Sequence, residues 1–217
     1  MKYKTIFDYW TDNLCNGGND LFPFHLTKGK KVLEIGCGSG NDAVRFVKSG
    51  AKYTGIDLTH RAMETTKLKI GNKGITKQMN AEFIDFPDNH FDVVYSFGVI
   101  HHTINPNNVI NEMHRVLKPD GLIFIMVYNK MSFRYLVEIQ ILRRIAWFLH
   151  HPKYKVIRKV IPHPTKEEWL SINTDNVGCP LSRVYTKKQS EELLNKFKGV
   201  KSFTTDKHWF RIVFGKK

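Results

Sequence analysis

The feature that most constrains this chain is an apolar run that ends in three glycines at alternate positions, Val32–Gly40 (VLEIGCGSG). An apolar run of this length predicts a buried strand. Glycine turns tightly through positive φ and leaves no Cβ between the backbone and a ligand. A strand, a glycine loop and a helix in this order place backbone N–H groups at the carboxyl end of the strand. We therefore expect a nucleotide-like cofactor to lie there.

The hydrophobic pattern around this loop alternates short strands with helices, which implies βαβ units and a parallel sheet. After the fifth strand the rhythm breaks into a basic amphipathic helix and a Pro-rich, loop-like stretch. The sequence predicts an α/β fold: a three-layer, doubly wound, mostly parallel sheet with a C-terminal antiparallel strand and a helical insertion after the fifth strand. Strands are expected at 31–35, 52–57, 81–84, 91–97 and 122–128, and helices at 42–48, 60–70, 106–117, 131–151 and 186–197, before an antiparallel pair within 200–214.

At 217 residues the chain is expected to form a single domain with elaborations. We divide it into a lid-like N-terminal segment (1–27), a cofactor-binding core (28–128), a basic substrate-side insertion (129–185) and a closing helix with strands (186–217). The net charge of +14 is concentrated in the second half, where residues 131–217 hold 18 Lys/Arg against 7 Asp/Glu. This asymmetry indicates either an acidic partner of the second half or solvated lysines that aid solubility.

The three cysteines, Cys15, Cys37 and Cys179, are odd in number and widely spaced. Their spacing fits neither a zinc site nor a disulfide framework, so we predict no metal and a reducing, cytoplasmic location. The N-terminal residues lead into no apolar signal segment, which agrees with that location.

The spacing around the glycine loop narrows the ligand. A dinucleotide fingerprint, Gly-x-Gly-x-x-Gly, would place its third glycine at position 41, where Asn41 stands. Glu34 lies in the strand before the loop, and Asp57 ends the next strand 23 residues later. An acid at a strand end can bind both hydroxyls of a ribose and repels a 2′-phosphate. The loop therefore suits a nucleoside ligand without a pyrophosphate.

These features, together with further blocks, make the chain resemble the class I S-adenosylmethionine (SAM)-dependent methyltransferases, in the small-molecule branch typified by the enzymes of ubiquinone and menaquinone biosynthesis. The resemblance covers roughly residues 28–128 and implies a Rossmann-like fold, SAM as the methyl donor and S-adenosylhomocysteine as the product. The matching blocks are Val32–Gly40, Gly55–Asp57, Asn80–Glu82 with Phe86–Asp92, Ser96–His102 and Arg115–Gly121.

The resemblance also implies cofactor-binding roles. The loop residues approach the methionine and ribose parts of SAM, Glu34 orients the loop and the amino group, and Asp57 binds the ribose hydroxyls. Asn80 stands where the family usually has Asp, and an amide oxygen can still accept a hydrogen bond. Structural alternatives stay open: Glu34 as a cap of the loop, Asp57 as a helix N-terminal acid, and Phe97 as core wall. The implied cofactor residues are Glu34, Gly36, Cys37, Gly38, Gly40, Asp57, Leu58, Asn80, Ala81, Glu82 and Phe97.

His101 and His102 follow the fourth strand, where a methyl acceptor would lie. In extended geometry their side chains point to opposite faces, so at most one faces the site. The candidate catalytic residues are therefore His101 and His102, one of them acting as a base or an acceptor contact. The alternative is a hydrogen-bonded link between the strand and the next helix. A base is needed only if the acceptor arrives protonated.

The acceptor is constrained mainly by what is absent. Ser96–Val99 stands where methyltransferases of nucleic-acid amino groups carry Asp/Asn-Pro-Pro-Tyr/Phe, and no Pro-Cys nucleophile is present. We expect methyl transfer to a small molecule, anionic or amphiphilic, with the basic helix 131–151 contacting a membrane surface. Two alternatives remain: an RNA methyltransferase that uses the basic C-terminal half, and a SAM-binding module without turnover.

Overall fold

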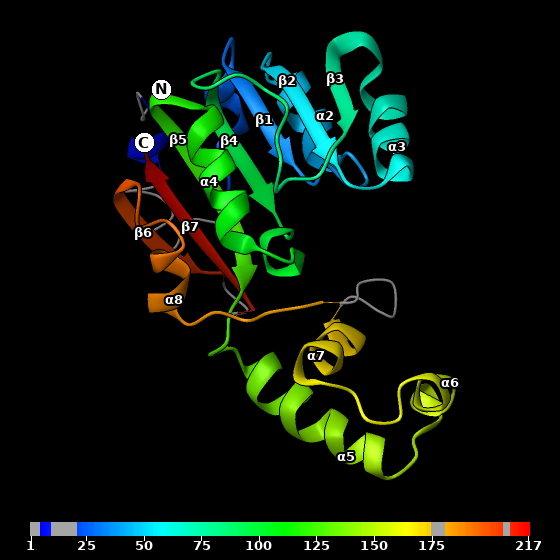
Figure 1. Ribbon diagram of the computed structural model, residues 1–217. Helices are drawn as coiled ribbons and strands as arrows, with labels where there is room; N and C mark the ends of the chain where they lie inside the picture. Colours follow the sequence, from blue (N-terminus) through cyan, green and yellow to red (C-terminus); the bar gives the residue numbers. More distant parts are fainter. Residues whose placement is uncertain (1–4, 10–20, 175–180, 206–208) are drawn as a thin grey trace.

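The computed structural model describes residues 5–9, 21–174, 181–205 and 209–217. At its centre is a single seven-stranded sheet (Figure 1). Its strands are β1 (Lys31–Ile35), β2 (Lys52–Asp57), β3 (Gly74–Gln78), β4 (Phe91–Phe97), β5 (Leu117–Tyr128), β6 (Lys198–Thr204) and β7 (Phe210–Lys216).

The strand order is β3-β2-β1-β4-β5-β7-β6. The neighbours from β3 to β5 pair in parallel, whereas β7 runs antiparallel to both β5 and β6. The direction of the strand order reverses between β1 and β4, which is the position where doubly wound sheets bind ligands. The predicted mostly parallel sheet with a closing antiparallel pair is confirmed.

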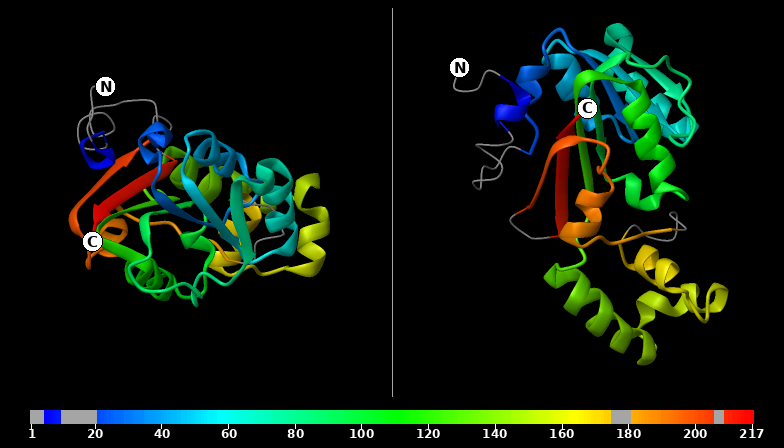
Figure 2. Two further views of the ribbon diagram at one scale, coloured as in Figure 1. Left: turned by 90° about the horizontal axis from the view of Figure 1, so that it is seen from above. Right: turned by 60° about the vertical axis from the view of Figure 1, so that its left-hand side comes forward.

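Helices cover both faces of the sheet, as Figure 2 shows from two further directions. Alternate side chains of one strand enter opposite cores: Val32 of β1 packs with Phe46 and Tyr53, while Leu33 packs with Val94 and Val109. The first face carries α1 (Ile6–Tyr9), η2 (Phe24–Thr27), α2 (Asn41–Lys48), α3 (His60–Ile70) and η3 (Gly71–Lys73); the second carries α4 (Pro106–Val116) and α8 (Lys187–Glu192).

The third strand is not where the sequence predicted it. It lies at Gly74–Gln78, and residues 81–84 belong to the connection between β3 and β4. β3 is an edge strand with little burial, and Ile75 is 55% exposed, so its apolar signal is weak. Ile84 is buried although its backbone is not part of the sheet.

Arg115 of α4 holds that connection in place. Its guanidinium donates to the Ile84 carbonyl (2.6 Å) and the Phe86 carbonyl (2.8 Å), and it pairs with Asp88 (2.7 Å). Glu112 accepts from the same guanidinium, and this hydrogen bond lowers the pKa of the Glu112 carboxyl. The planar guanidinium of Arg115 carries several N–H groups. It thus satisfies backbone carbonyls that belong to no helix or strand.

The insertion after β5 is mainly helical in its described part. The helix predicted at 131–151 is found as one continuous helical path over residues 134–148, and its first part has π-type hydrogen bonding. The prediction of a loop-like stretch after this helix is wrong for residues 152–174, because three further helices lie there. Pro and Lys residues weaken their helical pattern in the sequence. The elements are η5 (Arg134–Leu142), α5 (Arg143–Phe148), η6 (Pro152–Tyr154), α6 (Lys155–Val160) and α7 (Lys166–Thr174).

This arm projects beyond the sheet from the carboxyl end of β5 (Figures 1 and 2). It has a small core of its own, in which Ile139 and Trp147 pack against Tyr154 and Trp169. Tyr128 of β5 belongs to the same cluster and joins it to the sheet.

Three remaining expectations concern the ends of the chain. The helix predicted at 186–197 is shorter, since α8 ends at Glu192; Thr186 begins it with a capping box to Gln189. Of the lid-like N-terminal segment, residues 5–9 and 21–27 are described, and Ile6–Tyr9 form α1. Cys15 and Cys179 lie outside the described residues, and Cys37 is buried as a free thiol.

Replacing the Arg115 clamp tests the fold. We expect Arg115→Ala to lower the free energy of unfolding by about 1–3 kcal/mol, because it leaves partly buried carbonyls without their donor and leaves Glu112 with only the Ile84 N–H. The measurement is urea denaturation followed by circular dichroism. Arg61→Ala, an exposed position of α3, is the matched control and should change stability by less than about 0.5 kcal/mol. Equal effects of the two substitutions would contradict the clamp.

Candidate cofactor and acceptor site

The loop between β1 and α2 is pressed against its neighbours. Gly36 has φ +77°, and its N–H donates to the Ile56 carbonyl of β2 at 2.8 Å. A Cβ on Gly36 would lie 2.1 Å from Cγ2 of Val99, which follows β4. Gly40 has φ +75°, and a Cβ on it would lie 2.9 Å from the Thr66 Cα of α3. Only glycine allows the loops after β1 and β4 to meet this closely.

Gly38 is different, because the space beside it is open. Its φ is +51°, and an added Cβ would meet only the Gly36 carbonyl, at 3.9 Å. Its N–H donates to Oδ2 of Asp57 at 3.0 Å. The middle of the loop therefore presents bare backbone to a ligand while the strand-end acid holds it in place.

Asp57 is largely occupied by the protein itself. Its Oδ1 accepts from the Thr59 N–H and the Thr59 hydroxyl, both at 2.9 Å, and Oδ2 accepts from Gly38. A carboxylate offers about four acceptor positions. The site predicted for ribose hydroxyls thus keeps one position on Oδ2, beside the loop, unless the Thr59 hydroxyl turns away.

A second acid, Glu34, is buried beneath the loop. The Tyr53 hydroxyl donates to Glu34 Oε2 at 2.6 Å. Burial raises the pKa of Glu34 to about 8, and the nearby carboxylates of Asp42 and Asp57 push it in the same direction. The sequence analysis missed Tyr53, and likewise Tyr95, whose hydroxyl donates to Asp42 at 2.7 Å. The only feature of the sequence that pointed to these residues was a tyrosine, with its polar hydroxyl, at a strand position expected to be buried.

The raised pKa of Glu34 makes stability depend on pH. The folded chain binds a proton that the unfolded chain releases near pH 4.5, so this stabilisation is present below pH 4.5 and is lost as pH rises through about 8. Glu34→Gln keeps an acceptor for Tyr53 and cannot ionise. From pH 5 to 8 we expect the variant to gain stability relative to the wild type, on the order of 1–4 kcal/mol. Urea unfolding across pH measures this, and parallel profiles would contradict it.

The remaining loop residues divide between exposed and structural positions. The Cys37 side chain is buried, and burial raises the pKa of its thiol to about 11, which makes it unreactive. Leu58 is 67% exposed at the end of β2. Phe83, which the sequence analysis did not single out, is 72% exposed beside the Ala81 position.

Glu82 has protein partners of its own. Its carboxylate accepts from the backbone and side-chain N–H groups of Asn105, both at 3.0 Å, and these bonds lower the pKa of Glu82. Asn80 Oδ1 accepts from the Glu82 N–H at 3.0 Å, which forms a local turn. Glu82 thereby fixes the start of α4. Phe97 is partly buried, with its ring 6.1 Å from that of Phe210.

The two histidines do not point to opposite faces, so that prediction is wrong. Residues Ile100–His102 form a 3₁₀ turn, and the His101 and His102 ring centroids are 4.1 Å apart. His101 is fully buried against Tyr128, and within the described residues its ring nitrogens have no hydrogen-bond partner of good geometry. Burial, together with the neighbouring His102, holds the pKa of His101 well below its usual value. His101 is therefore neutral.

His102 is held by the segment that returns from the insertion. Its Nδ1 lies 2.7 Å from the Leu181 carbonyl and 3.1 Å from the Ser182 hydroxyl. A carbonyl can only accept, so we assign the proton to Nδ1, which leaves the lone pair of the neutral ring on Nε2.

Arg183 fastens the same returning segment to the histidine turn. Its N–H donates to the His101 carbonyl at 3.0 Å, and its guanidinium donates to the Thr103 and Ile104 carbonyls. The sequence analysis missed Arg183, since one arginine in a basic region carries no signal. The arm and the histidine turn are therefore one connected unit.

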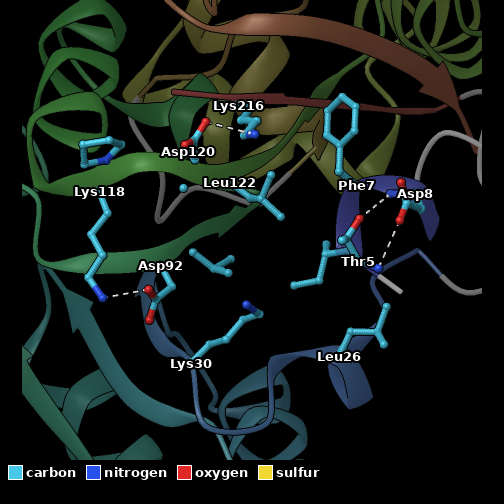
Figure 3. Close-up of a pocket in the computed structure, with 14 residues that line it drawn as sticks. Thr5, Phe7, Asp8, Leu26, Lys30, Asp92, Lys118, Asp120, Leu122 and Lys216 are labelled. Carbon is cyan, nitrogen blue, oxygen red and sulfur yellow. Dashed lines mark hydrogen bonds and ion pairs between the residues drawn. The ribbon is translucent and has the colours of Figure 1, made fainter. Parts of the chain in front are cut away.

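A cavity lined by described residues lies at the other end of the sheet (Figure 3). It measures about 450 Å³ and is lined from the amino ends of β4 and β5. Two of its lysines are already paired, Lys118 with Asp92 at 2.7 Å and Lys216 with Asp120 at 2.9 Å. The cavity is thus separate from the glycine loop and the histidine turn.

Comparison with known proteins agrees with this geometry. Residues 33–125 match the profile of a family described as a methyltransferase domain. Ubiquinone biosynthesis O-methyltransferase of Actinobacillus pleuropneumoniae serotype 7 is 32% identical over 136 residues, which are 59% of this chain and 56% of that protein. The Pseudomonas aeruginosa (strain LESB58) protein of the same name is 33% identical over 115 residues, covering 51% and 50%. The chain spans about half the length of the curated relatives it matches.

Solved structures share the whole fold. A SAM-dependent methyltransferase from Mesorhizobium loti superposes with a TM-score of 0.62 at 16% identity, covering 91% of this chain and 94% of that one. One from Methanosarcina mazei gives 0.60 at 21% identity, covering 92% and 99%. Residues 33–125 thus match a methyltransferase domain, and the chain as a whole shares the fold of these SAM-dependent methyltransferases.

The assignment of Asp57 is tested by SAM binding. We expect Asp57→Ala to weaken SAM at least tenfold, since it removes the ribose acceptor and the bond that holds Gly38. Isothermal titration calorimetry measures the dissociation constant. Asp85→Ala, an exposed acid of the β3–β4 connection, makes the same charge change and should leave it unaltered. Unchanged affinity in a folded Asp57→Ala protein would contradict the role.

Proposed function

We propose that this chain transfers the methyl group of SAM to a hydroxyl oxygen of a small amphiphilic molecule, and that His102 accepts the proton of that hydroxyl. One observation carries the proposal: the glycine loop after β1 and the loop after β4 are in contact through Gly36 and Val99. The histidine turn begins one residue after Val99. A nucleophile beside His102 would therefore lie next to the glycine loop, where the methyl donor would bind.

The residues of the loop fit a cationic nucleoside. The Asp42 and Asp57 carboxylates lie close enough to Glu34 to raise its pKa, so acidic groups gather at the carboxyl edge of β1 and β2. The bare backbone at Gly38 and the remaining acceptor position of Asp57 suit the ribose. When bound, SAM supplies an activated sulfonium methyl group. The protein's own contribution is to position the acceptor, which supplies on the order of 7–11 kcal/mol in well-oriented reactions.

His102 would act through Nε2. The Leu181 carbonyl accepts from Nδ1 and fixes this tautomer, and it also stabilises the ring once Nε2 is protonated. As the oxygen–carbon bond forms and the carbon–sulfur bond breaks, the hydroxyl proton passes to Nε2. His101 supports the arrangement by packing between His102 and Tyr128.

Three features support a small acceptor that is methylated on oxygen. The curated relatives are named ubiquinone biosynthesis O-methyltransferases. The segment at the end of β4, Ser96–Val99, lacks the signature of nucleic-acid amino methylation. The arm that follows β5 returns to His102, which places it beside the expected acceptor rather than elsewhere on the molecule.

Methyl transfer from labelled SAM into a cell extract tests the activity. We expect the label in organic-extractable small molecules, in a product from which base does not release it as an ester would. Asp57→Ala serves as the inactive control. Label recovered in RNA would overturn the small-molecule assignment, and a lack of any label with intact SAM binding would favour a module without turnover.

The role of His102 is tested on the identified acceptor. We expect His102→Asn to lower kcat by about 10²–10⁴ while the SAM dissociation constant stays within about twofold, because only the proton transfer is lost. The loss should shrink as pH rises toward the acceptor's own pKa. His163→Asn, an exposed histidine of the insertion, is the matched control. Full turnover by His102→Asn would reject the base.

A further inference from the structure

The helical arm has two apolar sides, and only one of them is used within the chain. Tyr135, Ile139 and Trp147 recur about every four residues and turn inward to the small core with Tyr154 and Trp169. Their burial leaves them 0–9% exposed. A helix that packs on one side normally carries polar residues on the other.

Here the other side is apolar as well. Of the fifteen large hydrophobic residues that are exposed in the described part of the chain, ten lie within residues 131–160. Most of the ten lie on the helix from 134 to 148 or directly beside its ends. Monomeric proteins rarely gather so many exposed apolar side chains on one element without a use for them. Among them are Phe133 (71% exposed), Leu136 (41%), Ile141 (50%), Ile145 (51%), Phe148 (74%) and Leu149 (76%).

Basic side chains lie on the same arm as these apolar residues. Residues 131–160 hold seven Lys/Arg and one acidic residue, Glu138. Glu138 is taken by Arg143 and Arg134 within the same helix. Arg144, Lys155 and Lys159 are exposed. Val156 (72% exposed) directly follows Lys155, and Val160 (74%) directly follows Lys159. The arm thus combines exposed apolar and cationic side chains on one structural unit.

We propose that this face of the arm, residues 133–160, docks on the surface of an anionic lipid bilayer. Exposed Leu, Ile and Phe side chains enter the boundary between headgroups and acyl chains, and lysines and arginines bind the lipid phosphates. No helix of the described residues is both long and apolar enough to cross a membrane, so the arm lies on the surface.

Charge decides between this partner and a second copy of the chain. A symmetric dimer through the same face would bring seven cations of one arm against seven of the other, with one acid on each side. An anionic bilayer neutralises these charges instead. The exposed apolar side chains would be buried in either case. The excess of cations therefore favours an anionic bilayer over a second copy of the chain.

The location of this face indicates how the acceptor would reach the site, an inference that rests on the proposed function. The arm leaves the sheet at the end of β5 and returns at Leu181–Arg183, where it holds His102 and the turn before Thr103. An amphiphilic acceptor that resides in the bilayer would then reach the methyl donor from the membrane side.

Vesicle co-sedimentation tests the docking without any turnover. The probes are vesicles of phosphatidylcholine alone and of phosphatidylcholine with phosphatidylglycerol, at low and at high salt. We expect binding to the anionic vesicles only, falling with salt. Ile145→Ser/Phe148→Ser should lower the partition coefficient at least tenfold, and Lys155→Gln/Lys159→Gln should lower it about fivefold per lysine.

Matched controls make equal changes on the core. Leu68→Ser/Ile75→Ser removes two exposed apolar side chains (86% and 55% exposed), and Lys67→Gln/Lys73→Gln removes two exposed charges; both should bind like the wild type. Lack of binding to anionic vesicles, equal binding to both vesicle types, or a dimer that Ile145→Ser/Phe148→Ser dissociates would overturn the proposal. SAM titration of the same variants separates this from a failure of the methyltransferase site, since their affinity for SAM should be unchanged.

Discussion

The structure depends on the close approach of two loops at the carboxyl edge of the sheet. Gly36 lies against Val99, and no side chain larger than a hydrogen atom fits between them. The backbone there is in the left-handed region, which glycine enters without strain. This contact sets the distance between the elements that would bind the methyl donor and the turn that would receive the acceptor. Every later feature of the site is built on it.

Beneath that contact the protein concentrates carboxyl groups in a poorly solvated region. Glu34 shares the proton of Tyr53, Asp42 accepts from Tyr95, and Asp57 holds Gly38. Burial and mutual repulsion keep Glu34 largely protonated at neutral pH, so the region is less charged without a ligand than its composition indicates. A cation placed above the loop would favour the ionised form. The two tyrosines make such a buried cluster tolerable, because each carboxyl keeps a donor.

The helical arm follows a different rule. It folds around its own aromatic core and touches the sheet mainly through Tyr128 and Trp209. Its connection to the chemistry runs through Arg183 and the Leu181 carbonyl, which hold the histidine turn. A short chain of hydrogen bonds thus links the arm to His102, so that a change in the position of the arm would move His102.

The sequence by itself determined most of the sheet, the glycine loop and the resemblance to methyltransferases. These rest on local patterns: apolar strands, glycines at fixed spacing, and the acids Glu34 and Asp57 at strand positions. It could not place β3, because an exposed edge strand has little apolar signal, and it missed the helices after Pro152. Only the tertiary structure decided the partners of the site. Tyr53 meets Glu34 across neighbouring strands, and Arg183 meets the histidine turn across 80 residues. A 3₁₀ turn brought His101 and His102 together where an extended chain would have separated them. Such contacts depend on how distant segments pack, and no spacing within one segment encodes that.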